Sequence, residues 1–282
     1  MLEGHYARYG GLVAFLDESY RADPRDGEFP FYTVSATLVH SDALEETRRA
    51  YLDLGLGGWW HTAELYERGE GWRIRDFIGL VAQQKTPILV AAQLHMLKNA
   101  PEQARRECLL QLCAHLADRD CRLVVYERRH AINERNSDAS LFQKAKAFGL
   151  LPRTVNTFSG HPGAENLLWG PDLAGWAMRR HLALADSVWV KPLAPHVEVI
   201  DVSEVSWVKK KKPESAAAND SGSESSAGLK DEGRYRSPGP SIAHHGRSGQ
   251  AIFTSFHVTS KPLHDPVDLS LWLSVSFPGT TT

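Results

Sequence analysis

The segment Gly11-Leu12-Val13-Ala14-Phe15-Leu16-Asp17-Glu18-Ser19-Tyr20 is the strongest structural signal in the chain. Its five consecutive apolar residues, 12–16, are too few to cross a membrane and too continuous for a half-exposed strand. A short apolar run bounded by glycine and a polar turn predicts a strand that is buried on both faces. The run ends in two carboxylates, Asp17 and Glu18. Because side chains alternate along a strand, we expect one of them on each face of the sheet.

The Asp17-Glu18 pair has two interpretations. A carboxylate at the end of a buried strand is capped, paired or bound to a cation, because low-dielectric surroundings disfavour its charge. Taken alone, Asp-Glu-Ser is more typical of a solvated turn, because short motifs produce many false matches. The other acidic residues of the chain are therefore needed to choose between the two.

The composition is that of an ordinary globular protein. The chain has 282 residues, of which 42% are hydrophobic and 23% charged, with a formal net charge of -2. Residues 1–201 are also mildly acidic, with 23 Lys and Arg against 26 Asp and Glu. This balance supplies no general attraction to phosphate, so it argues against a protein whose main role is to coat nucleic acid. It is compatible with an enzyme that has a local basic groove.

The cysteines and the apolar segments predict a soluble, cytoplasmic protein without a membrane span. Cys108, Cys113 and Cys121 form no CxxC motif and are odd in number, which is typical of buried free thiols in a reducing compartment. The first residues lack a basic region followed by an apolar core, so we expect no signal peptide. The apolar segment 88–97 is interrupted by polar side chains and is too short to span a bilayer.

Apolar periodicity and turn residues divide the first 201 residues into alternating elements. A hairpin of residues 12–18 and 31–40 comes first, and further strands are expected at 87–97, 121–126 and 154–158. Helices are expected at 41–55, 71–84, 101–117, 139–148 and 167–185. This order predicts an α/β fold with a mixed β-sheet flanked by helices on both faces.

The composition changes near residue 202, so we divide the chain into a domain of residues 1–201 and a low-complexity tail of residues 202–282. Four lysines, 209–212, are followed by Ser, Ala, Gly, Asn and Asp, and later by Ser-Pro-Gly-Pro. Such a segment cannot bury a core, which predicts a disordered tail. The lysines could contact phosphate, although a charge run of this kind is more often a solvated linker.

Several acidic residues lie at the ends of the expected elements. Asp17 and Glu18 end the first strand, Glu127 ends a later strand, and Asp172 begins the last helix, while Glu64 lies in a loop. Oxygen-rich clusters of this kind bind Mg²⁺ or Mn²⁺, which take a few carboxylates together with water and substrate phosphate. Two such ions about 4 Å apart can hold the attacking water and the leaving oxygen of a phosphodiester.

Each acidic residue also has a simpler explanation. Asp172 lies in the first turn of a helix, where any acidic residue is favourable. Glu127 precedes two arginines and could form a surface ion pair. His61 and Glu64 do not form the HExxH motif of zinc enzymes, and a histidine beside two tryptophans is more often a packed or capping residue. The acidic residues taken together are nevertheless stronger evidence for a metal site than any one of them alone.

A basic neighbourhood accompanies the acidic residues. Residues 121–153 hold seven Lys and Arg against three acidic residues, and they include Arg128 and Arg129. Arg179 and Arg180 add two charges from the last helix. We expect these four arginines to bind a phosphate backbone that passes the metal site.

Three motifs resemble the DUF3800 family of bacterial and phage proteins, over roughly residues 11–187. They are Leu16-Asp17-Glu18-Ser19, then Trp60-His61-Thr62-Ala63-Glu64, and then Leu168-Trp169-Gly170-Pro171-Asp172-Leu173-Ala174-Gly175-Trp176 with the following Ala-Met-Arg-Arg. The family has no assigned function, and its members look like ribonuclease H-like proteins. The chain departs from the family pattern at Tyr20 and Pro171, and neither departure removes a carboxylate.

The resemblance implies a ribonuclease H-like fold and a role for each acidic residue. Asp17 would be the metal ligand on the first strand, Glu127 the acidic residue on the fourth strand and Asp172 the ligand on the last helix, with Glu18 beside the first. A metal-dependent nuclease is therefore the first hypothesis, with Glu18 and Glu64 secondary and His61 as a proton carrier for the leaving group. A non-catalytic nucleic-acid- or protein-binding accessory of a mobile element or defence system is the second, and an enzyme acting on another phosphate ester is the third.

Overall fold

The computed structural model describes residues 3–24, 28–56, 58–96, 100–129, 132–202 and 267–268. The side chains of residues 3, 132–136 and 267–268 are not described. The tail for which disorder is predicted therefore lies outside the described residues, except for residues 202, 267 and 268. Residues 1–205 and 261–282 belong to one unit, and the following description concerns that unit.

One mixed β-sheet forms the centre of the fold, with strand order β5-β4-β1-β2-β3-β6-β7. β1 pairs antiparallel with β2 and parallel with β4, while β2–β3 and β6–β7 are antiparallel and β4–β5 and β3–β6 are parallel. The predicted mixed sheet that begins with a hairpin is confirmed. The strands are β1 (Leu12–Arg21), β2 (Phe31–His40), β3 (Ile88–Leu94), β4 (Leu123–Glu127), β5 (Asn156–Gly160), β6 (Val197–Asp201) and β7 (Val267–Asp268).

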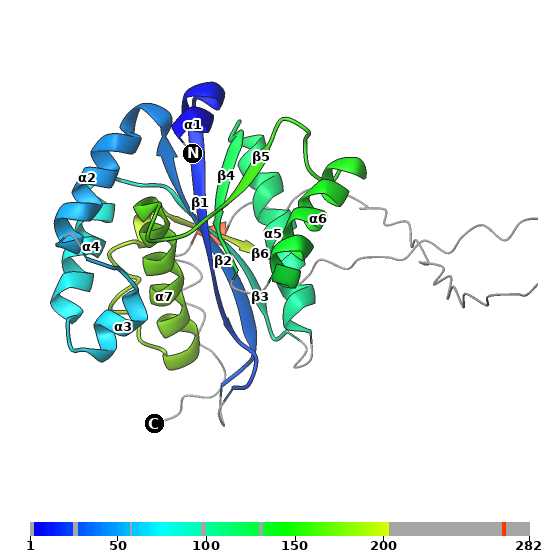
Figure 1. The fold of residues 1–282 in the computed structure, drawn as a ribbon. Coiled ribbons are helices and arrows are strands. Elements are labelled where there is room, and N and C mark those ends of the chain that lie inside the picture. Colours follow the sequence, from blue (N-terminus) through cyan, green and yellow to red (C-terminus); the bar gives the residue numbers. More distant parts are fainter. Residues whose placement is uncertain are drawn as a thin grey trace, which may run out of the picture. The chain divides into compact units, whose positions relative to one another are not determined.

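Helices cover both faces of this sheet, as predicted (Figure 1). α2, α3, α4 and α7 lie on one face, and α5 and α6 lie on the other. We call these the α7 face and the α5 face. The helices are α1 (Glu3–Tyr9), α2 (Leu44–Gly55), α3 (Thr62–Glu67), α4 (Gly71–Gln83), α5 (Pro101–Asp118), α6 (Ile132–Ala147) and α7 (Trp169–Leu184), with 3-10 turns at Ser41–Ala43, Asn166–Leu168 and Ala194–His196.

Alternation along the strands assigns side chains to the two faces. On β1, Val13 and Phe15 belong to the core of the α7 face, whereas Ala14 and Leu16 belong to the core of the α5 face. On β4, residues 123 and 125 face α7, and residues 124 and 126 face α5. Because each of these apolar side chains is almost completely buried, a strand cannot shift by one residue without exposing its core positions.

α7 lies close against β1 and β2 because its contact surface is made of glycine. A Cβ atom at Gly170 would approach the Thr37 Oγ1 atom to 3.0 Å, and one at Gly175 would lie 3.4 Å from the Ser35 Oγ atom. The small side chains of β2 on this face make the close approach of the helix feasible. The first turn of α7, which carries Asp172, is thereby held near β1 and the end of β4.

Four elements were not expected from the sequence, and one begins earlier than expected. α1, α3 and β6 are short, so they carry little periodicity, and β7 is a two-residue strand that pairs with β6. α6 begins at residue 132, whereas the apolar pattern predicts a start at 139. Its first residues are polar, Asn-Glu-Arg-Asn-Ser, and therefore lack the apolar repeat that marks a helix.

The cysteine prediction agrees with the structure. Cys108, Cys113 and Cys121 are all buried and free. Burial raises the pKa of each thiol, to about 12 for Cys113 and about 11 for Cys121. Among the helices of the described residues, none is both long and apolar enough to span a membrane.

Candidate active site

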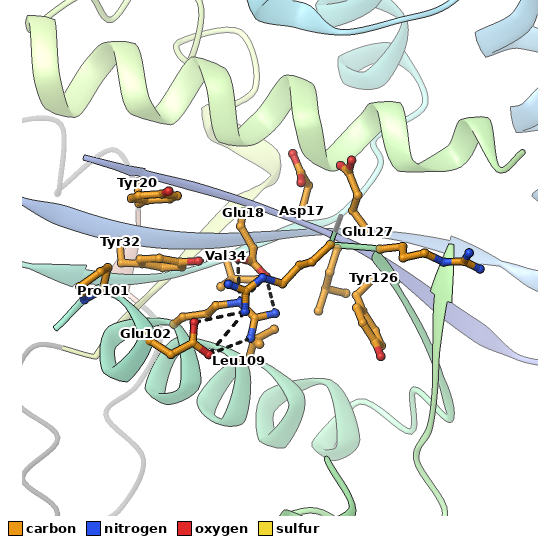
Figure 2. Close-up of a pocket in the computed structure, with 14 residues that line it drawn as sticks. Asp17, Glu18, Tyr20, Tyr32, Val34, Pro101, Glu102, Leu109, Tyr126 and Glu127 are labelled. Carbon is orange, nitrogen blue, oxygen red and sulfur yellow. Dashed lines mark hydrogen bonds and ion pairs between the residues drawn. The ribbon is translucent and has the colours of Figure 1, made fainter. Parts of the chain in front are cut away.

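Asp17 and Glu127 meet on the α7 face of two neighbouring parallel strands, where β4 ends. β1 continues past Asp17 and Glu18 to Arg21, so the expectation that the first strand ends at these two carboxylates is wrong. Leu16 is paired with Tyr126, so the next residues along each strand, Asp17 and Glu127, lie beside each other. The alternation described above directs both side chains toward α7, and Figure 2 shows them pointing to the same side of the sheet. The two carboxyl groups are close enough for Glu127 to raise the pKa of Asp17.

Asp172 reaches the same place from α7. It lies in the first turn of the helix, and its charge acts on Asp17 more strongly than the charge of Glu127 does. Asp17, Asp172 and Glu127 are all only partly exposed. The structure therefore brings together the three residues that the sequence proposes as metal ligands, from β1, β4 and α7. We call them the carboxylate cluster.

The cluster strongly disfavours the ionised form of Asp17. Loss of solvation is the largest cause, and the charges of Asp172 and Glu127 add to it, so that the pKa of Asp17 is raised well above its usual value. The neighbouring carboxyl group of Glu127 raises the pKa further, because it favours the protonated form of Asp17. A cation at this point would replace that proton.

Asp172 is held by a short hydrogen-bond chain from the start of α3. Its Oδ2 atom accepts the Thr62 backbone N–H at 2.8 Å and the Thr62 hydroxyl at 2.7 Å. The Trp60 indole N–H donates in turn to the Thr62 Oγ1 atom at 3.0 Å. Burial raises the pKa of Asp172, and the two bonds from Thr62 oppose this shift because they stabilise the charged form.

His61 and Glu64 lie at the rim of the cluster. The charge of His61 lowers the pKa of Asp172, and the charge of Glu64 raises it, so both act on the site. Both side chains are about half exposed. The His61 Nδ1 atom also accepts the Glu64 backbone N–H at 3.4 Å, which caps α3. The capping role considered from the sequence and a position beside the acidic site are thus both present.

Glu18 is not part of the carboxylate cluster. It faces α5, where it pairs with Arg105 at 2.7 Å and accepts a hydrogen bond from the Tyr32 hydroxyl. Arg105 also bonds Asp138 at 2.6 Å, and Arg105 and Asp138 are each at most 2% exposed. Glu18, Tyr32 and Arg105 line a cavity of about 480 Å³ on the α5 face, and Asp17 and Glu127 are also among its lining residues (Figure 2). The expectation that Asp17 and Glu18 point to opposite faces agrees with this arrangement.

Two of the four arginines that the sequence assigns to nucleic acid are engaged within the protein. Arg129 pairs with Glu102 at 3.2 Å on the α5 face. Arg180 pairs with Asp186 at 2.7 Å, and its guanidinium group lies over the aromatic rings of Tyr66 and Trp176. The side chains of Arg128 and Arg179 are exposed.

Sequence reasoning does not find the roles of Thr62 and Arg105. Thr62 lies within the quoted motif Trp60 to Glu64, but its bond to Asp172 spans 110 residues and follows only from the packing of α3 against α7. The apolar residues of α5 do not gather clearly on one side of the helix. An arginine in such a helix is ordinarily a surface residue. The one feature of the sequence that could indicate a buried Arg105 is that its helix lacks a clear polar face.

The donor set of the carboxylate cluster fits a hard divalent cation. Its oxygen ligands are the type that Mg²⁺ and Mn²⁺ prefer. Within the described ranges, no group of three or more His, Cys, Asp and Glu side chains is already spaced as a metal site. Because the pKa of Asp17 is raised, binding of a cation would require loss of its proton and a small adjustment of these side chains.

Comparison of this chain with protein families, curated proteins and solved structures finds no match. Its fold and site define a mixed α/β protein with three carboxyl groups gathered on one face of the sheet.

Thr62→Val should remove one of the two hydrogen bonds that position Asp172. The variant keeps the side-chain volume but loses the hydroxyl donor to Asp172 and the acceptor of Trp60, so we expect a loss of about 1–3 kcal/mol of stability at pH 7. The loss should shrink in acid, because the missing bond favours the charged carboxylate. Urea denaturation of the wild type, Thr62→Val and Thr62→Ser measures this. Equal destabilisation by Val and Ser would contradict it, because Ser retains the hydroxyl.

Proposed function

We propose that this protein is a divalent-metal-dependent phosphodiesterase that acts on nucleic acid. The observation that carries the proposal is the meeting of Asp17, Glu127 and Asp172 in a poorly solvated position. Three carboxyl groups in such a position repel one another unless a proton or a cation compensates them. Among the described residues, no arginine or lysine forms an ion pair with Asp17 or Asp172, so a structural ion pair does not account for the cluster.

The same positions support the proposed fold family. A ribonuclease H-like member of the DUF3800 family would carry its acidic residues on the first strand, the fourth strand and the last long helix. Asp17, Glu127 and Asp172 lie on β1, β4 and α7. We therefore propose a ribonuclease H-like fold and membership of this family, on the grounds of these positions and the sequence motifs.

In the proposed reaction, Asp17, Glu127 and Asp172 would bind Mg²⁺ or Mn²⁺. The bound metal would activate water and stabilise charge on the phosphate. Thr62 orients Asp172 through two hydrogen bonds, which leaves the other carboxylate oxygen for a ligand. The His61 Nδ1 atom accepts a backbone N–H, so the neutral ring carries its proton on Nε2. That position suits His61 to deliver a proton to the leaving oxygen, while exposed Arg128 and Arg179 would contact phosphate.

The proposal is tested by cleavage of mixed DNA and RNA substrates with Mn²⁺ or Mg²⁺. We expect metal-dependent cleavage by the wild type and a loss of at least 100-fold in the Asp17→Asn, Asp172→Asn double variant, because both ligand charges are removed. Asp76→Asn, on the exposed surface of α4, is the matched control and should cleave like the wild type. Circular dichroism of all three proteins checks that they are folded.

Two results would overturn the nuclease proposal. One is cleavage that persists in the double variant, which would come from another site or a contaminant. The other is the absence of cleavage together with no shift in melting temperature on addition of Mn²⁺. The second result would favour a non-catalytic binding protein in which a protonated Asp17 is the permanent state of the site.

A further inference from the structure

A half-exposed tryptophan borders the carboxylate cluster. β5 ends at Gly160, which is paired with Glu127, and the next residue is His161. The His161 and Trp59 rings lie 5.6 Å apart. Trp59 also comes three residues before Thr62, whose backbone N–H is 2.8 Å from Asp172. Two links therefore place Trp59 near the site. Its ring contacts His161, which follows the strand partner of Glu127, and its backbone leads to Thr62, which binds Asp172.

The surroundings of Trp59 leave an open aromatic surface. The adjacent Trp60 is 1% exposed and packs against Phe77 and Trp169, whereas Trp59 is 48% exposed. The indole of Trp59 packs against His161 and lies close to Gly163, where a Cβ atom would approach it to 3.4 Å. The His161 Nδ1 atom accepts the Gly163 N–H at 3.0 Å, which fixes the ring and leaves the Nε2 position of the neutral ring as a donor.

Within the part of the chain that the structure describes, the cationic side chains expected at the site are too few to bind a duplex by its backbone. A protein that holds duplex DNA electrostatically makes about 6–10 phosphate contacts. Of the four arginines expected at the site, Arg129 and Arg180 are engaged in ion pairs. Residues 1–201 also carry more acidic than basic side chains. Binding energy must therefore come largely from another source, and stacking of an unpaired base on an aromatic ring is such a source.

We infer that the site takes a single strand, with an unpaired base stacked on Trp59 beside the scissile phosphate and a phosphate oxygen bound by the Nε2–H group of His161. This inference rests on the proposed nuclease function for the phosphate, and it adds the substrate class. A duplex cannot offer a base face to Trp59 without being unpaired, so it should bind more weakly than its separated strands.

Fluorescence anisotropy of a labelled 12-nucleotide DNA strand, its RNA equivalent and the matching duplex tests the inference, with Ca²⁺ in place of the active metal. Trp59→Ala should weaken binding of the single strand about tenfold, because one stacked base is lost. Trp59→Phe should retain most of the affinity, because it keeps an aromatic face. Trp72→Ala is the matched control, because Trp72 is 55% exposed on α4, and it should bind like the wild type.

The outcomes separate this inference from the proposed function. Metal-dependent cleavage that requires Asp17 and Asp172, combined with unchanged single-strand affinity in Trp59→Ala, would overturn the stacking inference alone. A Trp59-dependent preference for single strands without any cleavage would support stacking and overturn the nuclease proposal. Duplex binding as tight as single-strand binding, with equal loss in Trp59→Ala, would overturn the single-strand assignment.

Discussion

Asp17→Asn is expected to raise the melting temperature of the metal-free protein at neutral pH while abolishing metal-dependent cleavage. The substitution removes a carboxylate whose charge is disfavoured by burial and by Asp172 and Glu127. The new amide can donate a hydrogen bond to Glu127, so the local packing is retained. We expect a gain on the order of 1–3 kcal/mol, or about 5 °C in melting temperature for a domain of this size. A gain in stability with a loss of activity is typical of a functional site.

The gain should depend on pH in a defined direction. Because the pKa of Asp17 is raised in the folded state, its contribution to wild-type stability is fully present below the unfolded-state pKa and is lost as pH rises through the folded-state pKa. The variant has no such proton, so its advantage should grow from pH 5 to pH 8. Thermal denaturation across this range in EDTA measures the effect, with Asp76→Asn as the exposed control. A variant less stable than the wild type at pH 8 would show that the ionised Asp17 is stabilised instead.

Arg105→Met should destabilise the fold strongly, by about 3–5 kcal/mol. Arg105 is 2% exposed and pairs with Glu18 at 2.7 Å and Asp138 at 2.6 Å, and Asp138 is 1% exposed. Removing the guanidinium group leaves two carboxylates without their shared cation in a poorly solvated position. Arg105→Lys should restore little, because a single ammonium group cannot reproduce the separate contacts to both carboxylates.

Chemical denaturation at pH 7 and pH 5 measures the role of Arg105. The loss should be smaller at pH 5, because the unpaired carboxyl groups can take up protons. Arg106→Met is the matched control, because Arg106 is the next residue of α5, is 52% exposed and pairs only with Glu102 at 3.8 Å, so its loss should be at most about 1 kcal/mol. Equal losses for the two variants would show that the buried network contributes no more than a surface pair.

The β-sheet could be predicted because its strongest strands carry local signals. Residues 12–16 and 31–40 are apolar or β-branched over a strand's length, and turn residues separate them, so a hairpin follows from short-range chemistry. The sequence analysis does not find β6, whose five residues, Val-Glu-Val-Ile-Asp, pair with β3 and β7 from distant parts of the chain. The start of α6 is not found either, because the residues that follow Ile132 are polar and carry no apolar repeat.

The acidic site was predictable only in part. That Asp17 and Glu127 could lie side by side follows from two buried apolar runs that are each followed by an acidic residue, although β1 continues beyond Asp17 to Arg21. The separation of Asp17 from Glu18 follows from strand alternation, but the partner of Glu18 does not, because Arg105 is 87 residues away in the sequence. Likewise, the engagement of Arg129 and Arg180 depends on tertiary packing, which no count of basic residues can show.

Because Asp17 and Glu18 are adjacent residues of β1, an insertion or deletion in this strand would displace both of them. β1 pairs with β2 over ten residues, from Leu12 with His40 to Arg21 with Phe31. Deleting a single residue before Asp17 would place Glu18 at the position beside Glu127 and turn Asp17 toward the α5 face, whereas inserting one would place Asp17 at the position that faces Arg105. After the insertion the shorter Asp side chain would have to reach Arg105, and after the deletion the longer Glu side chain would crowd the cluster. An insertion or deletion here would therefore damage both charge networks at once, whereas a substitution at either position alters only one.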